Sequence, residues 1–361
     1  MHYFIYPAKD ATIYKEQPTQ NTGLDEVLEV QKAYYAGYLK EISRALIKWD
    51  LTEFSSSIVA NGISSPKFYL NLTVCEAEEI PFEYTLYAYA VSQSWEMGIG
   101  TKYDNLTTDG VSWRYLDSAE SGSATIWSPD AQYATGTTGS HAGYGGTWYT
   151  GSGYEATQSF SYSTGNVRMD VTDVVNTWLS GTVPNEGFIL KHTRAVEEDV
   201  NDYGILKFFS TDTSTIYPPK LEMVWDDSSF VTGSLTELTN EDIVLYMKGL
   251  RPEYKQNSRI KFRVVGRERH PAKTFSTSSQ YTTVKYLPTS SFSYSIRDTE
   301  TMETIIPFGD YTKISCDSSG NYFIVWLDGL QAERYYEITY RVSGSDTIQY
   351  FEDNYTFKLV R

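Results

Sequence analysis

The chain has 361 residues, 40% of them hydrophobic, which is long enough for two folding units that each bury a core. Its 31 tyrosines, 8 tryptophans and 16 phenylalanines are typical of β-sandwiches and of binding surfaces. The two cysteines, Cys75 and Cys316, are far apart and lie in no Cys/His cluster, which argues against a disulfide scaffold and a structural zinc site. The opening segment MHYFIYPAKD has no signal-peptide pattern, and no run of 18 apolar residues occurs, so we expect a soluble protein made without signal-directed export, and no membrane partner.

The net charge of −16 is unevenly distributed along the chain. Residues 1–227 carry 14 basic and 30 acidic side chains, whereas residues 228–361 carry 16 of each. A polar segment, DDSSFVTGSLTELT, follows the point where the balance changes. This asymmetry predicts two domains, 1–227 and 228–361, with different surroundings.

The first domain reads as a series of short strands. The segment HYFIYP opens as one, and PKFYLNLTVCEA and YTLYAYAVSQSW are two more. In SRALIKWDL, Ala45, Ile47 and Trp49 fall on one face, while Arg44 and Lys48 fall on the other. Strict alternation of this kind predicts a half-buried strand with its charges in solvent.

A loop-rich segment, Glu96–Gly165, interrupts these strands and is our candidate for a functional surface. Planar side chains in such loops can stack on sugar rings, although burial in the core is the alternative. The candidate glycan-stacking residues are Trp113, Trp127, Tyr144 and Trp148. Trp49, Trp178 and Trp225 lie in regular elements and are expected in the core.

The segment MDVTDVVNTWLSG is the clearest helical pattern in the chain. Its apolar residues recur at helical spacing, at Val171, Val174, Val175, Trp178 and Leu179. Asp170 or Thr172 can cap its start, and Gly181 is placed to end it. We expect a short amphipathic helix that seals a β-sandwich.

The second domain contains seven short strand patterns in about 130 residues, from DIVLYMKGL to NYTFKLVR, which predicts an immunoglobulin-like or fibronectin-like sandwich. Within RIKFRV the charges alternate with apolar residues, which predicts a row of cations on one sheet face. The candidate protein-interface residues are Lys248, Arg251, Arg259, Lys261, Arg263, Arg267 and Arg269. An acidic protein surface, including the first domain of another copy, is the favoured partner; an ordinary solvated strand face remains the alternative. No nucleic acid is expected, because the protein as a whole is acidic.

Catalytic patterns are missing from the sequence. The four histidines are scattered, and no H-x-H, H-E-x-x-H, G-x-S-x-G or phosphate-binding glycine loop occurs. A glycosidase-type carboxylate pair stays open among 46 acidic residues. The densest acidic run, Ala195–Gly204, could wrap a structural Ca²⁺ ion or form an exposed hairpin. We therefore expect no catalytic residue and no cofactor, with structural Ca²⁺ as the one alternative.

Three blocks in the first domain carry a family resemblance: AKDATIY followed by NTG, SRALIKWDL, and VRMDVTDVVNTWLSGTVPNEGFILK. Together they resemble the DNRLRE-type jelly-roll module of bacterial surface and carbohydrate-associated proteins, in the same order. The whole chain, including KFRVVGRERHPAKTFSTSS and CDSSGNYFIVWLDGL, is similar to structural proteins of tailed, T4-like marine bacteriophages.

The resemblance implies an all-β protein, with an N-terminal jelly roll that holds one short helix and a C-terminal Ig-like sandwich. It implies a virion component rather than an enzyme. Our hypothesis is a protein present in several symmetric copies in the tail, baseplate or neck, or in a fibre attached to them, with other virion proteins as partners. The alternative is a glycan-binding adhesion module that contacts the host surface.

Overall fold

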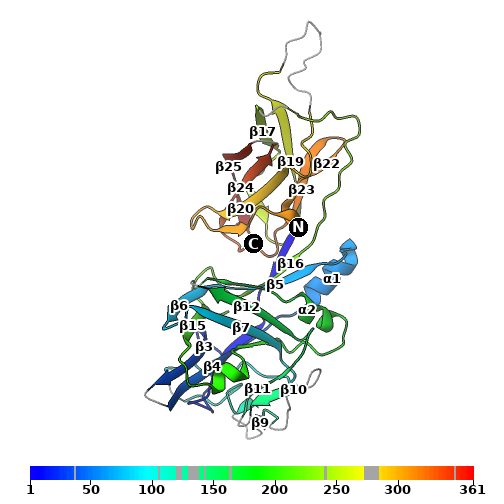
Figure 1. Ribbon diagram of the computed structural model, residues 1–361. Coiled ribbons are helices and arrows are strands. Elements are labelled where there is room, and N and C mark those ends of the chain that lie inside the picture. Colours follow the sequence, from blue (N-terminus) through cyan, green and yellow to red (C-terminus); the bar gives the residue numbers. More distant parts are fainter. Residues whose placement is uncertain are drawn as a thin grey trace. The chain divides into compact units, whose positions relative to one another are not determined.

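The computed structural model describes residues 1–35, 38–104, 106–118, 124–128, 138–141, 144–161, 165–239, 242–271, 284–344 and 347–361. The protein is all-β and sandwich-like, as the sequence predicts (Figure 1). It divides into two compact units: an N-terminal unit of Ile5–Gly62 and Lys67–Glu222, and a C-terminal unit of Met1–Phe4, Ile63–Pro66 and Met223–Arg361. The C-terminal unit thus includes three segments that the predicted boundaries assign to the first domain.

The N-terminal unit is built around one large sheet in the order β12-β7-β14-β4-β3-β15-β6, with β2 paired to β4. Its strands are β2 (Lys9–Tyr14), β3 (Val27–Tyr35), β4 (Tyr38–Lys48), β6 (Val74–Glu78), β7 (Glu83–Ala90), β12 (Glu155–Ser161), β14 (Phe188–Lys191) and β15 (Gly204–Phe209). A second set, β5 (Lys67–Leu72), β13 (Val167–Asp170) and β16 (Lys220–Val224), has the order β16-β5-β13. Two small ribbons pair β8 (Tyr115–Asp117) with β9 (Thr125–Ile126) and β10 (Thr138–His141) with β11 (Tyr144–Tyr149).

The predicted amphipathic helix is α2 (Thr172–Leu179), which contacts β5 and β12 (Figure 1). Val174, Val175 and Trp178 are buried, and the Trp178 ring lies 4.7 Å from that of Phe188. The Asp170 carboxylate accepts a hydrogen bond from the Thr172 amide, which fixes the entry into the helix. Burial of an apolar stripe, rather than intrinsic propensity, therefore stabilises this two-turn helix.

Two further helices occur in the described chain, where the sequence analysis expected one. They are α1 (Thr52–Asn61), which buries Phe54 and ends at left-handed Gly62, and α3 (Arg194–Glu198). α1 lacks a broad apolar stripe, so periodicity gave little sign of it.

The expectation of a half-buried strand at SRALIKWDL is wrong. Arg44 is as fully buried as its neighbours Ala45 and Ile47, because both faces of β4 are covered. On one face the Trp49 ring packs against Phe188, and on the other Leu46 belongs to a core built with residues of the loop-rich segment.

The C-terminal unit is a two-sheet sandwich, as predicted. One sheet has the order β17-β19-β23-β22 and the other the order β18-β25-β24-β20-β21. The strands are β17 (Ile243–Lys248), β18 (Glu253–Lys255), β19 (Arg259–Glu268), β20 (Phe292–Asp298), β21 (Thr304–Ile306), β22 (Ser315–Asp317), β23 (Gly320–Trp326), β24 (Tyr335–Ser343) and β25 (Ile348–Val360), with a short 3₁₀ helix at Asp310–Thr312. β1 (His2–Ile5) lies at the start of the chain.

Aromatic rings join the two sheets of this sandwich. The rings of Tyr294 and Phe323, from opposite sheets, stack with centroids 4.2 Å apart. Phe262, Phe357 and Phe4 lie in the same core. Close packing of large rings makes the two sheets a rigid support for the side chains on their outer faces.

Candidate interaction surface

Strand β19 turns a row of cations away from the sandwich core. Phe262 and Val264 point inward and are buried, so Arg259, Lys261 and Arg263 project from the opposite side of the sheet. Antiparallel pairing places Lys248 of β17 directly opposite Arg263. We call Lys248, Arg259, Lys261 and Arg263 the basic face.

Aromatic side chains from β23 lie among these cations. The pairing register sets Tyr322 opposite Arg263 and Trp326 opposite Arg259. The Lys261 ammonium lies 3.6 Å from the Tyr322 ring centroid, and the Arg259 guanidinium lies 5.1 Å from that of Trp326. These distances are those of cation–π contacts, which hold the cations in defined positions on the sheet.

One carboxylate, Asp317 of β22, is shared by two cations of the basic face. Arg263 donates two parallel hydrogen bonds to it, of 2.9 and 2.8 Å, and the Lys261 ammonium lies 2.9 Å from Oδ2. Hydrogen bonding from Arg263, with a further contribution from Lys261, holds the pKa of Asp317 well below its usual range. Asp317 therefore stays ionised at any physiological pH and pairs with two of the four cations.

Three other predicted interface residues lie apart from this cluster. Arg267 is farther along the same face of β19, opposite Val244, and donates to the Glu268 carbonyl. Arg269 lies just beyond the strand and is paired with Asp242 at 2.8 Å. Arg251 lies in the turn between β17 and β18.

Sequence analysis missed Asp317, Tyr322 and Trp326. Only the pairing of β22 and β23 beside β19 brings them to the basic face. The alternation in GNYFIVW, where Tyr322 and Trp326 share a side, was the one available signal.

The prediction of exposed tryptophans for glycan stacking is wrong. Trp113, Trp127 and Trp148 are 3%, 0% and 1% exposed and belong to one core cluster with β2, β4 and β14. A sugar needs an open ring face, which these side chains lack. The fourth candidate, Tyr144, has its side chain outside the described residues.

The tryptophan rings instead surround two buried cations. The Arg44 guanidinium lies 4.5 Å from the Trp113 ring centroid and 5.3 Å from that of Trp148, and the Lys191 ammonium lies 4.9 Å from Trp148. Both cations bind Glu197, whose oxygens lie 3.0 and 2.8 Å from Arg44 and 3.1 Å from Lys191. All three charged side chains are at most 1% exposed.

This buried cluster includes one carboxylate of the acidic run Ala195–Gly204. Glu197 of α3 points into the interior, so the run is not a wholly exposed hairpin. Burial lowers the pKa of Lys191 to about 8, although Glu197 opposes the shift, and burial lowers the pKa of His192 to about 4. In the described part of the chain, no group of three or more His, Cys, Asp or Glu side chains could hold a metal ion.

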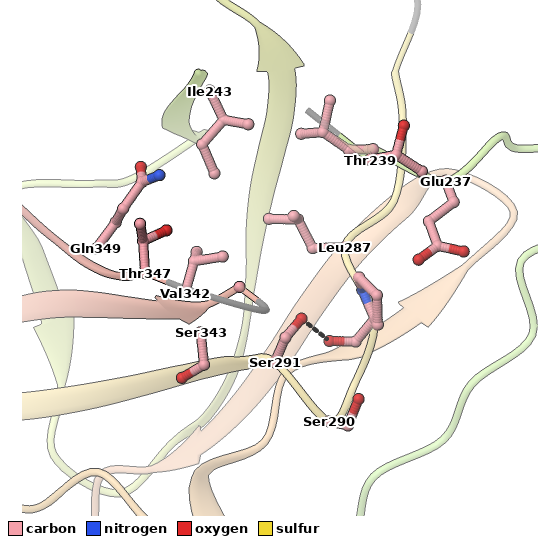
Figure 2. A pocket seen from close by; sticks show the side chains of 13 residues that line it. Glu237, Thr239, Ile243, Leu287, Ser290, Ser291, Val342, Ser343, Thr347 and Gln349 are labelled. Carbon is pink, nitrogen blue, oxygen red and sulfur yellow. Dashed lines mark hydrogen bonds between the residues drawn. The ribbon is translucent and has the colours of Figure 1, made fainter. Parts of the chain in front are cut away.

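A hollow of about 300 Å³ opens in the C-terminal unit, beside the start of β17, the end of β24 and the start of β25 (Figure 2). Its apolar wall includes Ile243, Leu287 and Val342. Its polar groups come from Glu237, Thr239, Ser290, Ser291, Ser343, Thr347 and Gln349. Of the thirteen described residues that line it, Glu237 alone has a titratable side chain, so these residues form no acid–base pair.

No helix in the described ranges is long and apolar enough to cross a membrane. Neither a protein-family model nor a curated protein sequence matches the chain. Two solved structures of a β-glucuronidase from Parabacteroides merdae, one with glycerol in its active site, align at 11% and 10% identity with TM-scores of 0.17 and 0.16. Each alignment covers 81% of this chain and 28% of the other, and similarity this low carries no argument about fold or activity.

Proposed function

We propose that this protein is a non-enzymatic structural component of a tailed-phage virion, present in several symmetric copies in the tail, baseplate or neck, or in a fibre attached to them. The observation that carries an assembly role is the basic face, where four cations and two aromatic rings stand on a rigid sheet. Arginine and aromatic residues are enriched in protein interfaces, where they supply most of the binding free energy.

The reason for proposing a phage virion is that several sequence blocks resemble structural proteins of tailed phages. The two β-rich units suit it, since each presents a firm sheet surface to a neighbour. The glycan-binding alternative relied on Trp113, Trp127, Tyr144 and Trp148, and it loses its main support because the three tryptophan rings lie in the core.

The test is quantitative mass spectrometry of density-purified particles of a phage that encodes the chain. We expect several copies per particle, in a fixed ratio to the major capsid protein. A non-structural protein of the same phage is the control and should be depleted by purification. Loss of the chain together with that control would contradict the proposal.

A further inference from the structure

The N-terminal unit has an acidic counterpart to the basic face. It consists of Glu76 and Glu78 on β6, and of Glu79, Phe82 and Glu83 in and after the connection to β7; we call these five residues the acidic edge. All five are exposed, and Phe82 is 76% exposed. Phe82 is the one large apolar side chain among these carboxylates.

Strand β6 leaves this edge accessible within its sheet. It is the last strand in the sheet order, and β15 is its one neighbour among the described strands of that sheet. One cation, Lys207 of β15, pairs with Glu76. Four carboxylates against this ammonium leave the acidic edge strongly negative.

The two surfaces match in spacing as well as in charge. Alternate residues of a strand lie on one side, roughly 7 Å apart. Glu76 and Glu78 therefore repeat at the same distance as Arg259, Lys261 and Arg263. Because β17 and β23 flank β19 within its sheet, β6 of a second copy would lie across the outer face of β19, where Glu76 and Glu78 can meet its cations.

The charge of the whole units favours the same pairing. The N-terminal unit has 14 basic and 28 acidic side chains, and the C-terminal unit has 16 and 18. A local excess of cations on a nearly neutral unit is attracted to a unit of charge −14, and such attraction also orients two partners as they meet.

We infer that the basic face of one copy binds the acidic edge of a second copy, in a head-to-tail contact. The inference rests on the proposed assembly role and names the partner surface for it. Because the two surfaces differ, each copy has one of each, and repetition of the contact generates a ring or an open filament.

The first experiment compares the purified full-length chain with charge-reversed variants by sedimentation velocity over a range of concentrations. Arg259→Glu/Lys261→Glu and Glu76→Lys/Glu78→Lys should each weaken self-association at least tenfold. The control for the first variant is Lys255→Glu/Arg361→Glu, which makes the same charge change at exposed positions outside the basic face. This control should associate within about twofold of the wild type. Circular dichroism checks that each variant keeps the wild-type fold.

The deciding experiment mixes the two reversed variants. In the mixture the native basic face of one variant meets the native acidic edge of the other, and the acidified face meets the basified edge. Association should therefore return in the mixture, although each variant alone associates at least tenfold more weakly than the wild type. A chain that carries both reversals should also self-associate. A contact between the two surfaces of one chain would not depend on concentration and would not give mixed complexes.

Unchanged association of the reversed variants, or no recovery on mixing, would overturn the inferred contact. That result leaves the proposed function standing if the chain is present in purified particles. Conversely, charge-dependent self-association of a chain missing from particles would overturn the virion assignment alone.

Discussion

In the N-terminal unit Arg44 and Lys191 share the carboxylate of Glu197, and in the C-terminal unit Arg263 and Lys261 share that of Asp317. The two clusters have the same composition, two cations on one carboxylate beside aromatic rings. They differ in solvent: the first is at most 1% exposed, whereas the side chains of the second are 30–42% exposed. Covering a cluster makes it part of the core, and leaving it open makes it available to a partner.

The physical reason is desolvation. A buried cation that loses its counter-ion keeps the full cost of leaving water, whereas an exposed one is hydrated and screened. The covered cluster should therefore matter for stability and the open one for association. The variants below test this difference, beginning with the largest expected effect.

Glu197→Gln should lower the unfolding free energy of the N-terminal unit by about 3–5 kcal/mol, because Arg44 and Lys191 stay buried without a carboxylate. Urea unfolding followed by tryptophan fluorescence measures the change. The neighbouring Glu198→Gln is the matched control, since that side chain is 50% exposed and pairs with Arg194; its effect should stay below about 0.5 kcal/mol. Equal effects of the two variants would show that burial of the Glu197 carboxylate makes no difference to stability.

His192, next to Lys191, should make the N-terminal unit sensitive to acid. Its pKa falls on folding from 6.5 to about 4, because burial disfavours the charged ring. A lowered pKa gives stability that is fully present above pH 6.5 and is lost as the pH falls toward about 4.

Between pH 7 and 4 the wild type should lose about 3 kcal/mol more stability than His192→Gln, since that shift corresponds to about 1.4 kcal/mol per pH unit. Urea unfolding at several pH values measures both slopes. His270→Gln is the control, because that ring is 81% exposed and should keep the wild-type slope. A His192→Gln slope equal to that of the wild type would contradict the prediction.

Asp317→Asn should change the unfolding free energy by less than about 1 kcal/mol, because the ion pairs of the open cluster are exposed and screened. The same variant should tighten self-association, roughly twofold to tenfold, since the carboxylate that competes for Arg263 and Lys261 is gone. Urea unfolding and sedimentation velocity measure the two effects. A loss of stability as large as that of Glu197→Gln would show that the exposed cluster stabilises the fold as much as the buried one does. Weaker association would show that Asp317 does not compete with a partner for these cations.

Sequence patterns predicted the elements with strong periodicity. The stripe of Val174, Val175 and Trp178 specified a helix and its buried side, and the alternation in RIKFRV specified the outward cations of β19. Both predictions depend on residues close in sequence, so local geometry suffices for them.

The same reasoning misplaced Arg44 and the loop tryptophans. Alternation shows which residues share a face of a strand, but not whether that face meets solvent or another layer. Arg44 does lie opposite to Ala45 and Ile47, and it is buried because Trp113 and Trp148 cover its side of β4.

The amino-acid sequence by itself determined the all-β class, the α2 helix and the row of cations, because each follows from the period of apolar residues along one segment. Only the tertiary structure decided that Asp317 and Tyr322 join the basic face and that Glu197 neutralises buried cations. Those contacts depend on strand order and on which layer covers which face, and they join residues up to 153 positions apart in the chain.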